Sequence, residues 1–175
     1  MIQKYTYGKP FETEAIVVSV PTAEGTPAYG TISTENGFSF TYDMDDNDVV
    51  YGLGEANRGI NKRGYVYESN CSDQPDHSED KISLYGAHNF IVVSGKQTFG
   101  LFIDYPGKLR FDIGYTLSAQ LKITCEDADL YLYVIEGETP YDIVKQFRKI
   151  IGRSYIPPKF AFGFGQSRWG YTTAD

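Results

Sequence analysis

Two side chains of this sequence whose types could bind a ligand are the carboxylate of Asp73 and the indole of Trp169. Asp73 lies in a Ser-Asp-Gln-Pro run at residues 72–75, and Trp169 follows an alternation of Phe and small residues. A carboxylate can accept hydrogen bonds from the hydroxyl groups of a neutral molecule, and an indole offers a flat apolar face with an N–H donor. Both also have a purely structural interpretation, Asp73 as the start of a turn before Pro75 and Trp169 as a packed core residue.

Metal or phosphate binding has weaker support in the sequence. The acidic run at residues 43–48 resembles a calcium loop in its spacing but lacks the central Gly and the closing Glu. His77 and His88 do not have ligand spacing, and we expect His88 to be a hydrogen-bonded structural residue. The YGLGE run at residues 51–55 lacks the Lys and the helix of a phosphate loop, which favours a close-approach turn at a strand end. We therefore expect no metal and no cofactor.

Composition narrows the class of protein further. Aromatic residues make up 15%, with 15 Tyr and 11 Phe, and 18 Gly interrupt short apolar runs, a mixture typical of β structure with many turns. The net charge is −7 without a basic cluster, which argues against nucleic-acid or membrane partners. The N-terminus lacks the apolar core of a signal peptide, and Cys71 and Cys125 lie in no motif. We expect a cytoplasmic protein with two free thiols.

Alternating apolar residues predict a chain of short strands that position these side chains. A long polar stretch at residues 56–84 interrupts them, and such loops are commonly functional. Thr139 as cap, Pro140, Asp142 and a final Gly152 predict one late helix. The pattern as a whole predicts an antiparallel β-sandwich. The expected strands are residues 11–20, 29–33, 38–42, 49–51, 65–67, 90–93, 98–103, 109–113, 121–124 and 130–135.

The last residues predict a different kind of strand. Phe160, Phe162 and Phe164 alternate with small residues, which is typical of a strand packed closely on both faces. A polar loop and a possible helix cap follow, as at the opening of a βα unit. A lone buried strand cannot pair with itself, so we expect the sequence to be the front part of a larger protein.

Five stretches, in this order and at similar spacing, resemble glycoside hydrolase family 31, the family of α-glucosidases and α-xylosidases. The resemblance covers nearly the whole chain and is closest to bacterial α-glucosidases. It implies a mainly β fold, with a galactose-mutarotase-like antiparallel β-sandwich and one late helix at residues 1–157. A linker and the first strand of a truncated (β/α)8 barrel would follow at 158–175. The stretches are YGLGE at 51–55, SDQP at 72–75, LYGAH at 84–88, PPK at 157–159 and FGQSRWGY at 164–171.

The resemblance also implies an activity. The intact protein would be a retaining, exo-acting α-glucosidase that hydrolyses terminal α-linked glucose from maltose-type or isomaltose-type oligosaccharides. By matching position, Asp73 would contact substrate from a loop over the barrel mouth, and Trp169 would line the same pocket. The two catalytic aspartates of the family lie on later barrel strands, so we expect no catalytic residue in these 175 residues and no activity from them alone. An α-xylosidase stays open, because the residues that read the C6 group of the sugar are expected in the barrel.

Two other functions remain alternatives. The aromatic content and the long polar loop also suit a stand-alone carbohydrate-binding module, and the chain could instead be a structural or assembly domain. As part of the intact enzyme, the expected protein partner is the chain's own missing barrel. The isolated chain is expected to pair with a second copy through residues 158–175, because an exposed Phe-rich strand is a template for association.

Overall fold

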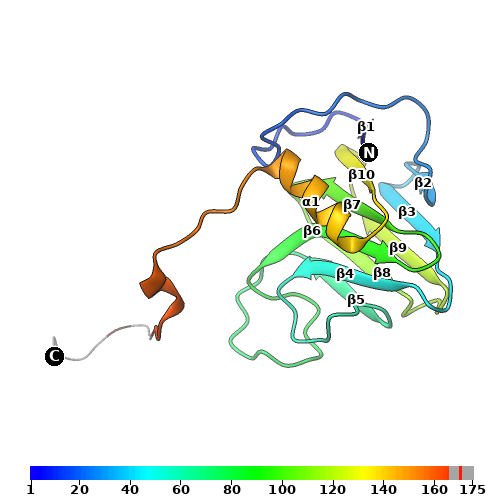
Figure 1. Ribbon diagram of the computed structural model, residues 1–175. Coiled ribbons are helices and arrows are strands. Elements are labelled where there is room, and N and C mark those ends of the chain that lie inside the picture. Colours follow the sequence, from blue (N-terminus) through cyan, green and yellow to red (C-terminus); the bar gives the residue numbers. More distant parts are fainter. Residues whose placement is uncertain (166–169, 171–175) are drawn as a thin grey trace.

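Two five-stranded antiparallel sheets pack face to face to form a β-sandwich (Figure 1). The structure is a computed structural model that describes residues 1–165 and 170. One sheet has the order β1-β10-β7-β6-β4 and the other β2-β3-β9-β8-β5. The strands are β1 (Ile2–Tyr7), β2 (Thr31–Ser33), β3 (Phe38–Asp43), β4 (Val49–Gly54), β5 (Tyr65–Ser69), β6 (Ala87–Ser94), β7 (Phe99–Asp104), β8 (Leu109–Ile113), β9 (Gln120–Cys125) and β10 (Leu130–Glu136).

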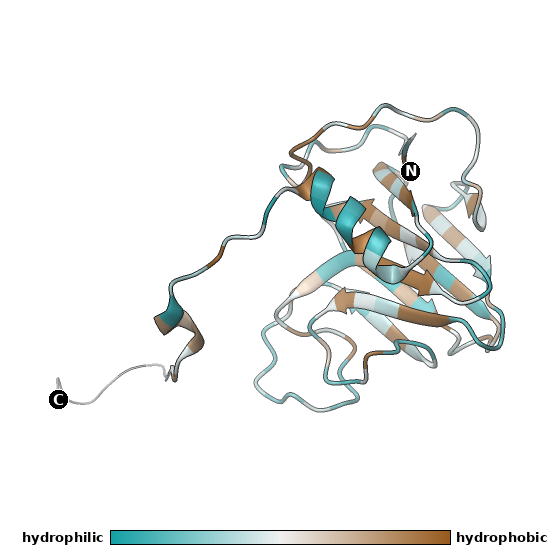
Figure 2. Cartoon of the chain, viewed as in Figure 1, coloured by the Kyte–Doolittle hydropathy of each residue, from teal (hydrophilic) through white to brown (hydrophobic). Residues whose placement is uncertain are grey.

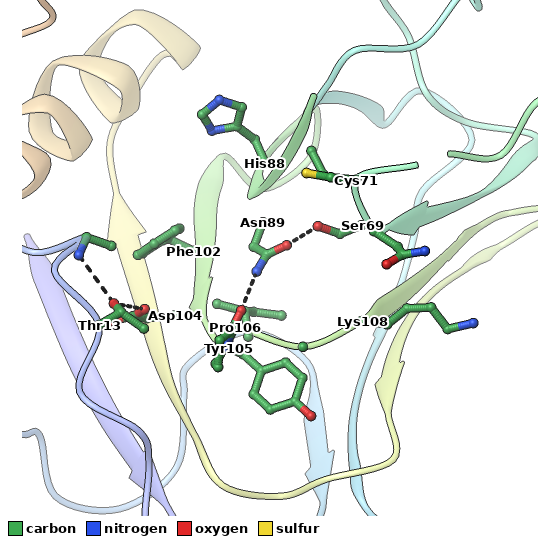
Figure 3. Close-up of a pocket in the computed structure, with 15 residues that line it drawn as sticks. Thr13, Ser69, Cys71, His88, Asn89, Phe102, Asp104, Tyr105, Pro106 and Lys108 are labelled. Atoms are coloured by element: carbon green, nitrogen blue, oxygen red, sulfur yellow. Dashed lines mark hydrogen bonds between the residues drawn. The ribbon is translucent and has the colours of Figure 1, made fainter. Parts of the chain in front are cut away.

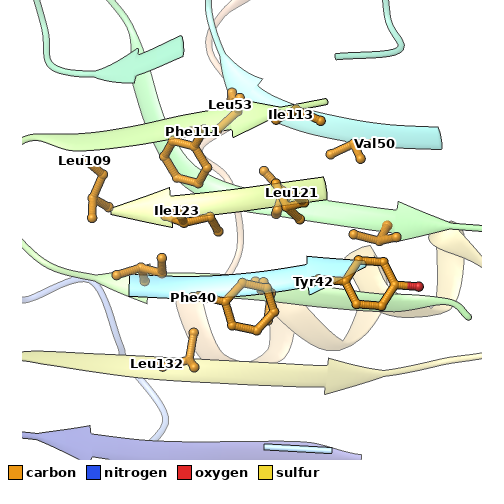
Figure 4. Packing of buried hydrophobic residues seen from close by; sticks show 14 of the residues in the cluster. Phe40, Tyr42, Val50, Leu53, Leu109, Phe111, Ile113, Leu121, Ile123 and Leu132 are labelled. Atoms are coloured by element: carbon orange, nitrogen blue, oxygen red, sulfur yellow. The ribbon is translucent and has the colours of Figure 1, made fainter. Parts of the chain in front are cut away.

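The main core fills the space between the two sheets. In β3, Phe38, Phe40 and Tyr42 point inward and alternate with partly exposed residues, as a strand with one wet face requires. Phe40 belongs to one buried cluster with Ile123, Phe111 and Leu132, which come from three other strands (Figure 4). Hydropathy alternates along the strands in the same way (Figure 2). The mainly β prediction is therefore confirmed.

A single helix, α1 (Pro140–Ile151), covers the outer face of the first sheet. Thr139 caps it, and the side chain of Asp142 bonds back to the Thr139 backbone, so the predicted capping box is present. Ile143, Phe147 and Ile150 are buried against the sheet. The helix prediction is confirmed. Within residues 1–165, no helix combines the length and apolar character needed to span a membrane.

The strand expected at residues 11–20 is wrong. Ile2–Tyr7 instead pairs with β10 and occupies that edge of the sheet. Residues 11–20 cross over the end of α1 without regular structure, and the backbone N–H groups of Val17 and Val18 donate to the carbonyl of Ile150 at 2.8 and 3.2 Å. These two N–H groups are therefore paired with a carbonyl at the end of the helix, and not with a neighbouring strand. The other expected strands are present, with bounds shifted by up to three residues.

The segment after α1 also differs from its prediction. Residues Lys159–Phe162 form a short 3-10 helix, and the linker projects away from the sandwich (Figure 1). A strand requires a neighbour for its backbone hydrogen bonds, and none of the described strands pairs with this segment. Phe164 is 95% exposed. Residues 160–165 thus form no strand in the described part of the chain. The boundary at 157/158 stays a prediction, and Trp169 lies outside the described residues.

The close backbone approach predicted for the YGLGE run is present, but as a bulge within β4, which extends to Gly54, and not as a turn after the strand. Gly52 has φ +121°, and a Cβ there would lie 2.2 Å from the carbonyl oxygen of Phe90 on β6. The register between β4 and β6 shifts between Gly52 and Gly54. This bulge redirects the chain toward Glu55, whose contacts are described below.

We expect Gly52→Ala to destabilise the protein by about 3 kcal/mol, because the new methyl group meets rigid backbone and the positive φ is unfavourable for Ala. Gly59→Ala is the matched control. A Cβ at Gly59 would meet no atom within 4 Å, and its φ is not positive, so the free energy of unfolding should change by less than about 0.5 kcal/mol. Urea unfolding of both variants measures the difference, and equal midpoints would contradict the assignment.

Candidate functional site

The candidate site is the loop between β5 and β6, residues 70–86, which we call the β5–β6 loop. It has no regular structure, but its two legs are joined by hydrogen bonds. The N–H of Ser72 donates to the carbonyl of Leu84 at 2.8 Å, and the hydroxyl of Ser83 donates to the carbonyl of Asn70. Leu84 is only 3% exposed and anchors one leg in the protein interior. The loop is therefore held in place although it contains neither helix nor strand.

Asp73 lies exposed on this loop. The hydroxyl of Tyr85 donates to Oδ1 of Asp73 at 2.6 Å, across twelve residues of sequence. This bond raises the pKa of Tyr85 above its ordinary value. The ring of His77 meets the Tyr85 ring edge-on, with 5.5 Å between centroids. The partner of the carboxylate is thus a side chain on the opposite leg, whereas an Asp that starts a turn bonds to nearby backbone.

Arg58 ties the β5–β6 loop to the sandwich. Its guanidinium donates to three backbone carbonyls, those of Val66 at 2.9 Å, Glu79 at 2.6 Å and Asp80 at 3.2 Å. The same group lies 4.3 Å above the ring of Tyr65. One side chain therefore satisfies carbonyls on both β5 and the loop. Nothing in the local sequence marked Arg58, because its partners lie 8, 21 and 22 positions further along the chain.

Glu55 holds the second leg of the loop. The N–H of Gly86 donates to Oε2 of Glu55 at 2.8 Å, and the N–H of Glu55 donates to the carbonyl of Gly86, also at 2.8 Å. The YGLGE and LYGAH runs, which are far apart in the sequence, therefore meet in space. Gly86 follows Tyr85 directly, so this contact also fixes the backbone next to Tyr85, the residue that bonds to Asp73.

A separate cleft of about 530 Å³ opens at the base of the loop (Figure 3). Asp104, at the end of β7, is 6% exposed, and the hydroxyl of Thr13 donates to its Oδ1 at 2.5 Å. Burial raises the pKa of the Asp104 carboxyl. His88, expected to be a hydrogen-bonded structural residue, is instead exposed at the rim of the cleft. Asp73 is not among the described residues that line this cleft, so the cleft and the surroundings of Asp73 are distinct.

The acidic turn at residues 43–48 is built around a structural carboxylate. Asp48 is buried and accepts hydrogen bonds from the hydroxyl of Tyr42 at 3.1 Å and from the backbone N–H groups of Asp45 and Lys96, both at 2.9 Å. Burial and the neighbouring Asp48 raise the pKa of Tyr42 to about 12. Among the described residues, no three His, Cys, Asp or Glu side chains are grouped so that they could hold a metal ion.

The two-sheet sandwich, its single outer helix and the long braced loop together define a galactose-mutarotase-like domain. The model of the glycosyl hydrolase 31 N-terminal galactose mutarotase-like domain matches residues 3–112. The chain therefore belongs to glycoside hydrolase family 31, as the N-terminal domain of its members.

Curated relatives agree with this assignment. The chain is 32% identical over 149 residues to alpha-glucosidase 2 of Bacillus thermoamyloliquefaciens, which covers 79% of this chain and 19% of that enzyme. It is 27% identical over 120 residues to alpha-xylosidase XylQ of Lactiplantibacillus pentosus, covering 69% of this chain and 15% of that enzyme. The chain thus spans about a fifth or less of the length of these relatives.

Solved structures share the fold. A family 31 dextranase of Flavobacterium johnsoniae, complexed with isomaltotriose, superposes with a TM-score of 0.68 at 25% identity, over 76% of this chain and 16% of the dextranase. The cycloalternan-forming enzyme of Listeria monocytogenes, in complex with a pentasaccharide substrate, has a TM-score of 0.63 at 23% identity, over 72% and 12% of the two chains. The predicted family and sandwich fold are confirmed.

Replacing Arg58 by Lys should loosen the β5–β6 loop. A single ammonium group cannot reach three carbonyls, and hydrogen bonds from a charged donor contribute about 1.5–3 kcal/mol. We expect amide hydrogen exchange at Ser72 and Lys81 to accelerate about tenfold or more, which corresponds to about 1.4 kcal/mol or more of lost local stability. Arg110→Lys, an exposed residue of β8, is the control. Unchanged exchange in Arg58→Lys would show that the loop is braced by other contacts.

The raised pKa of Asp104 predicts a stability that depends on pH. A carboxyl with a raised folded pKa is charged at a cost in the native state, so stability falls as pH rises from the ordinary value of 3.8 through the folded pKa. Asp104→Asn removes that charge and should raise Tm at pH 7 by about 2 °C, with the gain vanishing near pH 3.

The control for this variant is Asp46→Asn, which neutralises an exposed carboxylate of the acidic turn. Its Tm should equal that of the wild type at both pH values. Thermal unfolding followed by circular dichroism at pH 3 and pH 7 measures all three proteins. A lower Tm for Asp104→Asn at pH 7 would contradict the assignment.

Proposed function

We propose that this chain is the N-terminal domain of a retaining, exo-acting α-glucosidase that hydrolyses terminal α-linked glucose from oligosaccharides. Relatives named α-glucosidase and a structural neighbour complexed with isomaltotriose support this substrate class. Catalysis would proceed through a covalent glycosyl-enzyme intermediate on aspartates outside these residues, so the chain alone is inactive. The relatives named α-xylosidase keep that substrate as the closest alternative.

The single observation that carries this proposal is the setting of Asp73. Its carboxylate is exposed on a braced loop, and one of its oxygens is already bonded to Tyr85. The carboxylate can therefore accept a hydrogen bond from a hydroxyl of a maltose-type or isomaltose-type oligosaccharide at its other oxygen. A neutral sugar is bound in this way without a compensating cation.

The segment at residues 158–175 is proposed to be the linker and the first strand of a (β/α)8 barrel. Phe160, Phe162 and Phe164 are exposed, and apolar side chains of this size are normally covered. The missing barrel is the proposed cover, and Trp169 would then line the sugar pocket beside Asp73. Since active sites of such barrels lie at the carboxyl ends of the strands, the position after the first strand suits that role.

A second candidate is a stand-alone carbohydrate-binding or assembly module. The same exposed Phe side chains would then join two copies of the chain through residues 158–175.

A cytoplasmic location is part of the main proposal, supported by the free thiols of Cys71 and Cys125.

Asp73→Ala in the full-length enzyme should lower kcat/KM for maltose by about tenfold or more. Loss of one charge-assisted hydrogen bond to a sugar hydroxyl accounts for about 1.4 kcal/mol or more. Asp76→Ala removes an exposed carboxylate from the same loop and is the matched control, with kcat/KM expected to stay unchanged. Steady-state kinetics on both variants decides the matter. A loss below about threefold for Asp73→Ala would contradict its role in substrate binding.

A further inference from the structure

We propose that Tyr85 is a positioning residue for substrate binding: it holds Oδ1 of Asp73 so that Oδ2 is presented to a sugar hydroxyl. This inference rests on the proposed function of Asp73. It adds a second residue of the β5–β6 loop to the site, one that acts on the sugar through Asp73.

The contact itself is strong and directional. The distance from the Tyr85 hydroxyl oxygen to Oδ1 of Asp73 is 2.6 Å, in the range of a charge-assisted bond between a hydroxyl and a carboxylate. An Asp side chain on an exposed loop otherwise samples several rotamers. A donor from the opposite leg selects one of them. Because a hydroxyl supplies a single proton, the second carboxylate oxygen keeps its full capacity to accept.

Tyr85 can orient Asp73 only if its own backbone is fixed, and both of its neighbours in sequence are. The carbonyl of Leu84 accepts the N–H of Ser72, and Gly86 is bonded in both directions to Glu55. Ser72 directly precedes Asp73. The hydrogen bond between the two legs and the contact between the two side chains therefore start from adjacent residues, which fixes the distance between the phenol and the carboxylate.

The ring of Tyr85 is also restrained. His77, from the same loop, packs edge-on against it with ring planes inclined by 63°. Tyr85 is nevertheless 47% exposed, so the residue lies at the surface. The cluster of Asp73, His77 and Tyr85 is thus an exposed polar group with a restrained geometry. Such a geometry reduces the rotamer entropy that Asp73 loses when a sugar binds.

The geometry refines how Asp73 would contact a sugar. A carboxylate with both oxygens available can accept from two hydroxyls, but here one oxygen is already occupied. Asp73 therefore offers one fully available acceptor with a set direction. Removing the Tyr85 hydroxyl leaves that acceptor in place but lets it rotate, so binding should weaken without loss of the chemical step.

The test is Tyr85→Phe in the full-length enzyme with maltose as substrate. We expect KM to rise about three- to tenfold while kcat stays within about twofold, because the lost interaction serves ground state and transition state alike. Tyr65→Phe is the control, since Tyr65 is a comparably exposed tyrosine that stacks on Arg58 rather than bonding to Asp73. Its KM should equal that of the wild type.

A double mutant separates positioning from general loop stability. In an Asp73→Ala background, Tyr85→Phe should have no further effect on KM, because no carboxylate remains to be oriented. A structural role for Tyr85 would instead raise KM by the same factor in both backgrounds. Additive effects, or a Tyr85→Phe enzyme with wild-type KM, would overturn the inference.

The outcomes also distinguish this inference from the proposed function beneath it. If Asp73→Ala leaves kcat/KM unchanged, the role of Asp73 falls and the role of Tyr85 falls with it. If Asp73→Ala is strongly impaired while Tyr85→Phe is not, only the positioning role is overturned. Amide hydrogen exchange of the β5–β6 loop in Tyr85→Phe checks that the loop has stayed ordered.

Discussion

The burial of β7 and β10 on both faces is the constraint on which the rest of the structure depends. Every residue of β7 is buried, and so is every residue of β10 except the last. The opposing sheet covers one face, and α1 covers the other. The helix approaches so closely that a Cβ at Gly100 would lie 2.4 Å from the side chain of Ile143. Since both strands are fixed by packing, the neighbouring β6 and β4 are fixed as well, and with β6 the point at which the β5–β6 loop re-enters the first sheet.

A loop without regular structure can hold a side chain in place only if its backbone groups find partners elsewhere. In the β5–β6 loop those partners include Arg58, Glu55 and the bond between Ser72 and Leu84. Each of these joins the loop either to a strand end or to its own opposite leg. This satisfies carbonyl and N–H groups that a helix or strand would otherwise pair. Positional order and irregular backbone are therefore compatible here.

The sequence predicted elements whose signals are local and failed where a partner decides the outcome. Alternation marked β3 and β8–β10, and the capping residues marked α1, because both signals reside within a few neighbouring positions. Residues 11–20 and 160–165 have equally good strand patterns. The edge of the first sheet beside β10 is occupied by β1, so residues 11–20 have no strand to pair with there. Residues 160–165 have no neighbouring strand among the described residues. A strand pattern thus shows that a segment can form a strand only where a neighbouring strand is free to pair with it.

The same distinction applies to the site. Asp73 was identified through its resemblance to a family motif, since an Asp before Pro is an ordinary turn residue on composition alone. The partners of Arg58, and the pairs Glu55–Gly86 and Thr13–Asp104, could not be found from sequence, because they join positions that no periodicity relates.

The contact between Tyr85 and Asp73 has a consequence for how the intact protein would be assembled. Donor and acceptor both belong to the β5–β6 loop, and the backbone that holds them is braced entirely within this domain. The direction of the carboxylate is then set when the sandwich folds and does not depend on contacts to a barrel. Docking of a barrel would bring an already oriented acceptor to the sugar site. Preorganisation of this kind lowers the entropy lost on binding, so the folding free energy of a non-catalytic domain would contribute to substrate affinity.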